Sequence, residues 1–312
     1  MRGPEGKTRY QLRLGRTDSM RKVGEERMYE GASSFRQPDI LSENEFRLFR
    51  ELIYDECGFS FGPEKQTLLE SRLRRRMDEL GISNAFEYYN LLTNPTGKSQ
   101  ELPALLDILM ICETSFFRNM PQFQLLKETV LPEIIARKEK GGGRVIRVWS
   151  AGCSTGQEPY SAAMAILEGL PDRAGWSVRV FASDLSFTAL ERAQCGMYRE
   201  DQLKGVDPVY VQRYFKQENG HYVISDQIKR HVIFDYHNLK NDNGLRGLDI
   251  IFCRNVLIYL DQGEQRRLIN RFANCILPGS YLFLGHAESL QGLSTRFTMV
   301  HRNKGIAYRL EG

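Results

Sequence analysis

Apolar residues in the first third of the chain recur at the spacing of α-helices. Ser42 and Glu45 form the pattern of a capping box, which marks a helix start. A second helix is expected to end at Gly81. Its predicted buried stripe contains four apolar residues, namely Leu69, Leu73, Met77 and Leu80. Since helical patterns continue to about residue 109, residues 37–110 are predicted to form an all-helical N-terminal domain.

Strands and helices alternate in the rest of the chain. A connecting segment and a helix are expected over residues 111–140. Short apolar runs then predict strands, at residues 145–149, 178–182, 232–235, 248–253, 281–284 and 305–310. Residues 197–230 interrupt the alternation with a hairpin turn at Asn219-Gly220, and we predict a small inserted β-subdomain there. Residues 141–312 are therefore predicted to be an α/β domain whose last two strands form an antiparallel edge.

Length and composition restrict the class of protein. With 312 residues and 41% hydrophobic content, the chain can bury one large core and one smaller core. Residues 1–36 have few apolar anchors, so we expect a disordered tail. No apolar run approaches the roughly 18 residues of a membrane span, so we expect a cytoplasmic protein without membrane insertion. The cysteines lack metal-ligand spacing, and a net charge of +4 is too small to indicate nucleic acid, so neither partner is expected.

A loop of small residues with Gly152 and Gly156 lies between a predicted strand and a predicted helix. A strand, a glycine loop and a helix in succession indicate a site for a nucleotide-type cofactor. Dinucleotide sites place pyrophosphate on the helix N-terminus, where this chain has Glu158, whose carboxylate repels phosphate and attracts cations. The loop therefore favours S-adenosyl-L-methionine, which carries a sulfonium and an ammonium group, over NAD. The alternative is a tight turn between packed elements.

Polar residues directly follow three of the predicted strands. Asp184 is placed to accept hydrogen bonds from ribose hydroxyls, and it also suits the N-cap of a helix. Asn238 and Leu239 follow the strand at residues 232–235, and Arg254 and Asn255 follow the strand at residues 248–253. Open α/β sheets bind ligands at the carboxyl ends of their strands, so these positions are candidates for the same site.

Two further stretches have the composition of a site. The predicted second helix carries arginine at positions 72, 74, 75 and 76. This run is either a solvated face or a docking surface for an acidic partner, and we assign Arg72, Arg75 and Arg76 to docking. Residues 113–119 place two phenylalanines beside polar groups, which indicates either a site or a connecting turn that fills the core between the domains.

Four motifs in one order carry a resemblance to a known family. The motifs are Thr114-x-Phe-Phe-Arg118, Ala-Gly-Cys-Ser-Thr-Gly-Gln-Glu-Pro-Tyr-Ser at residues 151–161, Ala182-Ser-Asp184, and Ile251-Phe-Cys-Arg-Asn-Val256 followed by Tyr259. Through them, residues 39–310 resemble the CheR-type chemotaxis receptor methyltransferases of bacterial signal transduction. The resemblance implies a Rossmann-like class I methyltransferase sheet with an inserted β-subdomain, preceded by an all-helical domain. It also implies methyl esterification of glutamates on cytoplasmic chemoreceptor helices, for sensory adaptation.

The resemblance further implies roles for individual residues. Contacts with S-adenosyl-L-methionine, which becomes S-adenosyl-L-homocysteine, are implied for Thr114, Arg118, Glu158, Asp184, Asn238, Leu239, Arg254 and Asn255. Arg118 and Tyr259 are implied to flank the transferred methyl group. A glutamate side chain with a pKa of about 4.3 is already ionised at neutral pH, so no general base is expected.

The chain departs from the family pattern in three places. Gln157 replaces a usual glutamate, and Cys112 stands where an asparagine is common near the cofactor. The hairpin at Asn219-Gly220 is shorter than in members that tether to the C-terminal pentapeptide of a receptor. We therefore expect the protein to act on the cytoplasmic domain of chemoreceptors without that tether. We also expect a monomer.

Two other functions fit parts of the pattern. A methyltransferase of the same fold that acts on another acidic protein or on nucleic acid would share the sheet. Nucleic-acid amino-methyltransferases usually carry an Asn/Asp-Pro-Pro-aromatic motif, however, where this chain has Cys253-Arg-Asn-Val256. A receptor-binding adaptor without catalysis would keep the fold, but four site residues argue against it, namely Arg118, Glu158, Asp184 and Tyr259.

Overall fold

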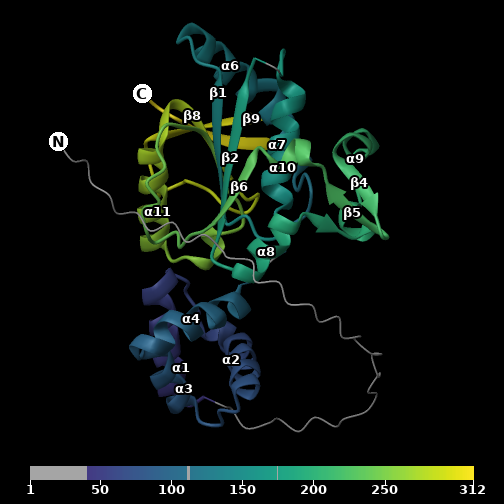
Figure 1. Ribbon diagram of the computed structural model, residues 1–312. Helices are drawn as coiled ribbons and strands as arrows, with labels where there is room; N and C mark the ends of the chain where they lie inside the picture. The colour runs from purple at the N-terminus through teal and green to yellow at the C-terminus, as the bar shows by residue number, and fades with distance from the viewer. Residues whose placement is uncertain (1–40, 111–112, 174) are drawn as a thin grey trace, which may run out of the picture. The chain divides into compact units, whose positions relative to one another are not determined.

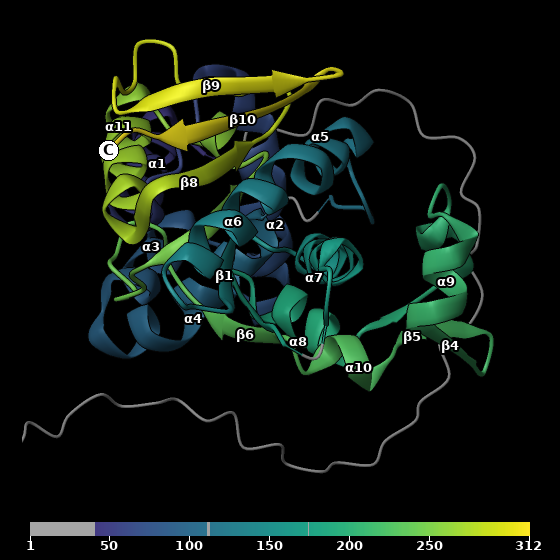
Figure 2. The same ribbon diagram turned by 90° about the horizontal axis from the view of Figure 1, so that it is seen from above.

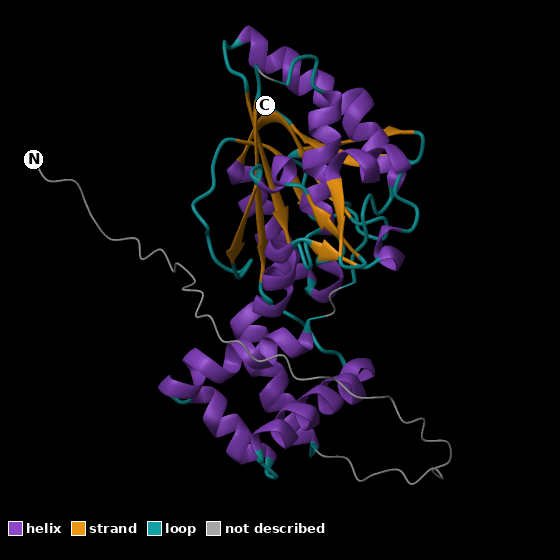
Figure 3. Cartoon of the chain, turned by 45° about the vertical axis from the view of Figure 1, so that its right-hand side comes forward, coloured by secondary structure: helices purple, strands orange, loops and turns teal. Residues whose placement is uncertain are grey.

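The computed structural model describes residues 41–110, 113–173 and 175–312. The predicted disordered tail and Cys112 lie outside the described residues. Within residues 41–110 the helices are α1 (Glu43–Cys57), η1 (Pro63–Lys65), α2 (Gln66–Leu80), α3 (Ala85–Thr93) and α4 (Pro95–Leu109). Figure 3 shows that this part of the chain is built of helices and loops.

Local signals set the ends of these helices. Ser42 and Glu45 form the predicted capping box of α1, and Gly81, with a φ of 69°, ends α2. Leu69, Leu73 and Met77 are buried as predicted. Leu80 is 38% exposed, so its predicted burial is wrong. Leu80 is the last residue of α2, and the buried stripe ends with Met77.

The second part of the described chain contains a seven-stranded sheet with the order β6-β2-β1-β7-β8-β10-β9. Figure 1 labels β1, β2, β6, β8 and β9 of this sheet. The strands are β1 (Val145–Ala151), β2 (Ser177–Asp184), β6 (Val232–Tyr236), β7 (Leu248–Cys253), β8 (Ile276–Leu284), β9 (Phe297–Arg302) and β10 (Gly305–Leu310). The pairs from β6 to β8 are parallel, whereas β10 is antiparallel to both β8 and β9. This arrangement confirms the predicted α/β class and Rossmann-like sheet.

Helices cover both faces of this sheet, as Figure 2 shows. Helices α7 (Gln157–Gly169) and α8 (Phe187–Cys195) lie on one face, and α11 (Gln262–Cys275) lies on the other. Every residue of β7 is buried, and alternate side chains enter different cores. Ile250 and Phe252 pack in the core with α7, whereas Ile251 packs in the core with α11. A strand buried on both faces explains the apolar run from Ile250 to Cys253.

The segment predicted as a β-subdomain forms a separate sheet in the order β3-β5-β4. Its elements are β3 (Met197–Tyr198), η3 (Glu200–Leu203), α9 (Pro208–Tyr214), β4 (Phe215–Glu218) and β5 (His221–Ile224), followed by α10 (Asp226–Lys229). Asn219 and Gly220 connect β4 to β5 with φ values of 48° and 76°. Positive φ at both positions is typical of the type I′ hairpin turn that the Asn-Gly pair predicts.

The helix expected over residues 111–140 is observed as α5 (Met120–Leu125), a π-helical turn η2 (Leu126–Val130) and α6 (Leu131–Lys140) in direct succession. Pro278 and Gly279 lie inside β8, where the pairing with β7 shifts register. Strand β9 was not predicted, because its Met299 is 54% exposed and an exposed edge strand lacks the buried alternation that marks an inner one.

Candidate active site

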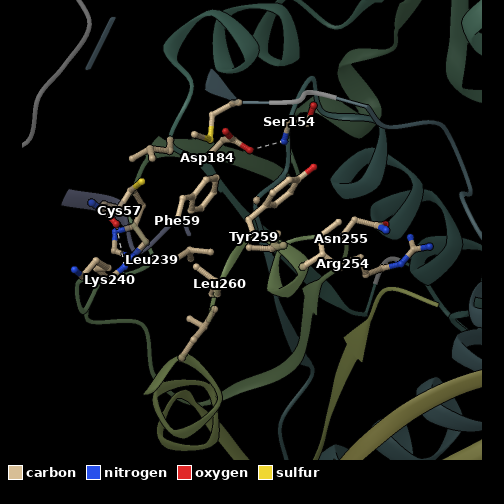
Figure 4. Close-up of a pocket in the computed structure, with 18 of the residues that line it drawn as sticks. Cys57, Phe59, Ser154, Asp184, Leu239, Lys240, Arg254, Asn255, Tyr259 and Leu260 are labelled. Atoms are coloured by element: carbon tan, nitrogen blue, oxygen red, sulfur yellow. Dashed lines mark hydrogen bonds between the residues drawn. The ribbon is translucent and has the colours of Figure 1, made fainter. Parts of the chain in front are cut away.

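A pocket of about 220 Å³ lies at the carboxyl ends of the central parallel strands. The nine residues predicted to contact the cofactor or the methyl group all line it, namely Thr114, Arg118, Glu158, Asp184, Asn238, Leu239, Arg254, Asn255 and Tyr259. Figure 4 shows Asp184 with Ser154 on one side, Arg254 with Asn255 on another, and Tyr259 between these pairs. The structure thus brings together residues that are up to 145 positions apart in the sequence.

The glycine loop after β1 is closely packed. A Cβ atom at Gly152 would lie 2.7 Å from Val256 Cγ2, and one at Gly156 would lie 2.8 Å from Ala193 Cβ. Both glycines also have positive φ, at 82° and 92°. Only glycine adopts this backbone without strain while leaving that space free. The loop is therefore a tight turn, and its Gly152 and Ser154 also line the pocket.

Asp184 holds this loop from the end of β2. Its Oδ2 accepts a 2.7 Å hydrogen bond from the Ser154 N–H, and its Oδ1 accepts one of 2.9 Å from the Ser186 N–H. The N-cap of α8 is Ser186, whose hydroxyl accepts from the Ala189 N–H, so Asp184 is not the cap itself. Burial raises the pKa of Asp184, and its backbone hydrogen bonds oppose that shift.

Glu158 and Arg254 form a buried pair at the floor of the pocket. Glu158 Oε1 accepts a 2.7 Å hydrogen bond from the Ser150 hydroxyl, and Oε2 lies 3.4 Å from Arg254 Nη1. Burial raises the pKa of Glu158, and burial lowers the pKa of Arg254. Both charges are thus incompletely compensated in the protein alone, as is common in functional sites.

The segment at residues 113–119 combines the two roles considered for it. Phe116 and Phe117 are buried in the core of the sheet domain, where Phe116 packs edge-on against Tyr198 at 4.8 Å. Thr114 and Arg118 line the pocket instead. Arg254 donates a hydrogen bond to the Arg118 carbonyl, so the segment is fixed to the loop after β7.

Backbone strain is concentrated at the loops of the pocket. Seven described residues other than glycine have positive φ. Asn219, Asn303 and Lys304 lie in hairpin turns. The other four lie in the pocket loops and are Phe117, Asn119, Ser154 and Asn255. Strained residues of this kind persist where the surrounding structure holds them, and they cluster at functional sites.

Residues from the helical domain also line the pocket, and sequence reasoning missed them. Phe59 stacks on Tyr259 with ring centroids 5.3 Å apart, and the Ser60 N–H donates to the Tyr259 carbonyl. Asn238 Nδ2 and Lys240 Nζ donate to carbonyls at the end of α1. These contacts join residues 182 to 200 positions apart, so no local pattern in the sequence marks them.

The predicted docking arginines lie outside this pocket. Arg76 donates to Glu101 through Nε and Nη2 and to Glu79 through Nη1. It is therefore committed to ion pairs within the helical domain. The Arg75 side chain is 64% exposed and pairs with Glu79 over one turn of α2. Gln157 accepts a hydrogen bond from the Thr155 hydroxyl and does not line the pocket, so this departure from the family pattern does not change its lining.

Several buried polar atoms at the pocket have no partner within the described chain. They are Ser154 Oγ, His237 Nε2, Arg254 Nε and Arg271 Nε. Burial lowers the pKa of His237. Unsatisfied buried groups around one cavity indicate that a polar ligand completes their hydrogen bonding. The pocket combines hydrogen-bond donors, the carboxylates of Glu158 and Asp184, and apolar side chains. This combination fits S-adenosyl-L-methionine.

The described residues were also considered as a metal site and as a membrane span. No group of three or more histidine, cysteine, aspartate or glutamate side chains there could hold a metal ion. Among the described helices, none combines the length and apolar character needed to cross a bilayer.

The fold and the pocket define the class of protein. A mostly parallel sheet with one antiparallel strand beside its edge, a glycine loop after β1 and an acidic residue at the end of β2 are typical of Rossmann-like methyltransferases. Residues 112–306 match the family described as CheR methyltransferase, SAM binding domain, and residues 44–110 match its all-alpha domain. The chain belongs to the CheR methyltransferase family.

Characterised relatives support this membership over most of the chain. The chemotaxis protein methyltransferase of Vibrio anguillarum is 37% identical over 277 residues, which cover 87% of this chain and 98% of that protein. Chemotaxis protein methyltransferase 1 of Pseudomonas aeruginosa is 37% identical over 271 residues, covering 85% and 97%. The chemotaxis protein methyltransferase of Escherichia coli is 37% identical over 266 residues, covering 83% and 89%. The predicted family is therefore confirmed.

Proposed function

We propose that this protein transfers a methyl group from S-adenosyl-L-methionine to glutamate side chains on the cytoplasmic domain of chemoreceptors, producing glutamyl methyl esters. The observation that carries the proposal is that Arg118 and Tyr259 line the same pocket as Glu158 and Asp184. The names of the relatives, chemotaxis protein methyltransferases, support a receptor as the substrate.

The residues proposed to hold the cofactor surround the pocket. Asp184 has lone pairs left to accept from ribose hydroxyls, Asn238 and Leu239 flank the base, and Glu158 attracts the positively charged end. When bound, S-adenosyl-L-methionine supplies a methyl group on a positively charged sulfur and is released as S-adenosyl-L-homocysteine. Thr114, Arg254 and Asn255 complete the proposed set.

The acceptor chemistry requires little of the protein beyond positioning. A glutamate with a pKa of about 4.3 is ionised at neutral pH, so no side chain has to remove a proton. Arg118 orients the incoming carboxylate, and Tyr259 offers it a weaker hydrogen bond. Phe59 and Leu260, which also line the pocket, limit the access of water to the reacting groups. Correct alignment of two reactants lowers the activation free energy by about 7 kcal/mol or more.

The docking surface proposed for the acidic receptor helix is now restricted to Arg72 and Arg75, because Arg76 is engaged with Glu101. The connection between β4 and β5 at Asn219 and Gly220 is short. We therefore propose that methylation does not depend on a C-terminal receptor pentapeptide. We further propose that the protein acts as a monomer.

The test is to incubate the protein with methyl-labelled S-adenosyl-L-methionine and a cytoplasmic chemoreceptor fragment. Label that mild base releases as methanol identifies glutamyl esters. Arg118→Ala should lower turnover about a hundredfold at saturating cofactor, since it removes a group that orients the acceptor. The double variant Arg72→Glu, Arg75→Glu should raise the KM for the receptor. Removal of the last five residues of the receptor should change neither kcat nor KM. A bound cofactor with no base-labile label on the receptor would contradict the proposal.

A further inference from the structure

Glu288 connects the loop after β8 to the loop after β7. It lies in a turn closed by a 2.9 Å hydrogen bond from its own N–H to the Gly285 carbonyl. Its Oε2 accepts hydrogen bonds of 2.6 Å from the Gly285 N–H and 2.9 Å from the Asn255 N–H. Its Oε1 accepts one of 3.3 Å from the Ile258 N–H. One carboxylate therefore satisfies three backbone donors.

Two of these donors belong to the segment that carries Asn255 and Tyr259 into the pocket. Asn255 has a φ of 61°, a left-handed conformation that is unfavourable for most residues. Ile258 lies in the single helical turn η4 (Leu257–Tyr259), whose first N–H groups have no partner within the turn. Without Glu288, the strained residue and the short turn would both lose a charge-assisted hydrogen bond.

The two loops are also packed closely at this point. A Cβ atom at Gly285 would lie 2.7 Å from Glu288 Oε2 and 2.9 Å from the Asn255 nitrogen. Glycine at position 285 thus allows the carboxylate to reach the far loop. Glu288 itself does not line the pocket. Its effect on the reaction has to pass through the residues that it holds.

We propose that Glu288 is a positioning residue for methyl transfer: it fixes the backbone from Asn255 to Tyr259, so that the Tyr259 side chain is held at the reacting carboxylate. The kinetic part of this proposal rests on the proposed function. The structural part concerns only the loops of this chain and can be measured without substrate.

The first test measures hydrogen exchange in the protein without cofactor. Glu288→Gln keeps the size of the side chain but turns an amide NH2 group toward backbone donors. We expect the amides of Asn255 and Ile258 to exchange at least tenfold faster in this variant. Glu191→Gln, the same change on an exposed residue of α8, should leave them unaltered. Equal exchange in wild type and Glu288→Gln would overturn the assignment, whatever the substrate is.

The second test is a double-mutant cycle in receptor methylation. Glu288→Gln should lower kcat about tenfold with little change in the KM for the receptor, and Tyr259→Phe should lower kcat as well. If Glu288 acts through Tyr259, the double variant should be no slower than the slower single variant. The positioning role would be overturned if the double variant lost kcat by the product of the two single losses. It would also be overturned if the kcat of Glu288→Gln stayed within twofold of wild type. An inactive wild type would contradict the proposed function instead, and the exchange result would still decide on Glu288.

Discussion

Two buried carboxylates lie at opposite ends of the same sheet and differ in how their charges are compensated. Asp249 is near the amino end of β7, and its side chain has 0% exposure. Arg137 Nη2 and Lys138 Nζ each lie 2.9 Å from Asp249 Oδ1, and the Arg147 N–H donates to Oδ2 at 2.9 Å. Two cations and a backbone donor thus surround one negative charge.

Glu158, at the carboxyl end of the sheet, has fewer partners. One cation lies 3.4 Å away, and one hydroxyl donates to the carboxylate. Burial is the main influence on Glu158 and raises its pKa. The charge of Asp249 is fully compensated, at the end of the sheet where we expect its ion pairs to stabilise the fold. The charge of Glu158 is incompletely compensated, at the end proposed to bind a cationic ligand. Each prediction below changes one side of this comparison.

The largest effect is expected at the compensated end. Asp249→Asn should lower the free energy of unfolding by about 3 kcal/mol, because the partly exposed Arg137 and Lys138 lose the buried counter-ion that they share. Urea unfolding would measure the change. Asp235→Asn, on an exposed position of β6, is the control and should stay within about 0.5 kcal/mol of wild type. If Asp249→Asn lost no more free energy of unfolding than the control, the stabilising role assigned to Asp249 would be contradicted.

The next largest effect is expected at the incompletely compensated end. Glu158→Gln should weaken binding of S-adenosyl-L-methionine by about a hundredfold, or about 2.7 kcal/mol, because the ligand cation loses its buried counter-charge. Calorimetric titration of the variant without receptor would give this number. Glu191→Gln on the surface of α8 should bind like wild type. An unchanged affinity in Glu158→Gln would show that the cofactor does not use this carboxylate.

A smaller effect is expected at Asp184, which already spends part of its hydrogen-bonding capacity on Ser154 and Ser186. Asp184→Asn should weaken cofactor binding about tenfold, since the amide replaces one acceptor by a donor toward the ribose. Asp207→Asn at the N-cap of α9 is a control with the same chemical change, because aspartate and asparagine are both good N-cap residues. Cofactor affinity equal to that of the control would contradict the ribose contact.

The smallest effect is a pH dependence in the protein without cofactor. The folded-state pKa of Glu158 is raised, so its contribution to stability is fully present below the unfolded pKa of about 4.3 and is lost as pH rises through the folded value. The side chain of Glu158→Gln does not ionise, so its contribution to stability does not change with pH. Its unfolding free energy should therefore increase relative to wild type between pH 4 and pH 7. A difference that is constant with pH, measured by urea unfolding at each pH, would show that burial does not raise this pKa.

Local patterns in the sequence predicted much of this molecule. The apolar runs of β1, β2 and β7, the capping box of α1 and the Asn-Gly turn between β4 and β5 are each encoded by adjacent residues. The polar positions after the parallel strands were predicted to meet because the carboxyl ends of such strands share one edge of a sheet. The prediction of a common site followed from topology.

Long-range pairings could not be predicted in the same way. Arg76 looked like part of a solvated or docking face, and only the structure shows its ion pair with Glu101, 25 positions away. Phe59 reaches Tyr259 from the helical domain, and Glu288 reaches Asn255 across 33 positions. Such contacts have no period in the sequence, because they depend on how separate elements pack.

The most direct test of the central claim is one set of calorimetric titrations with S-adenosyl-L-methionine, at a temperature where wild type, Glu158→Gln and Asp249→Asn are all folded. The account predicts that Asp249→Asn binds within twofold of wild type, whereas Glu158→Gln binds about a hundredfold more weakly. Equal affinity in wild type and Glu158→Gln, or weak binding confined to Asp249→Asn, would contradict the assignment of the two ends of the sheet.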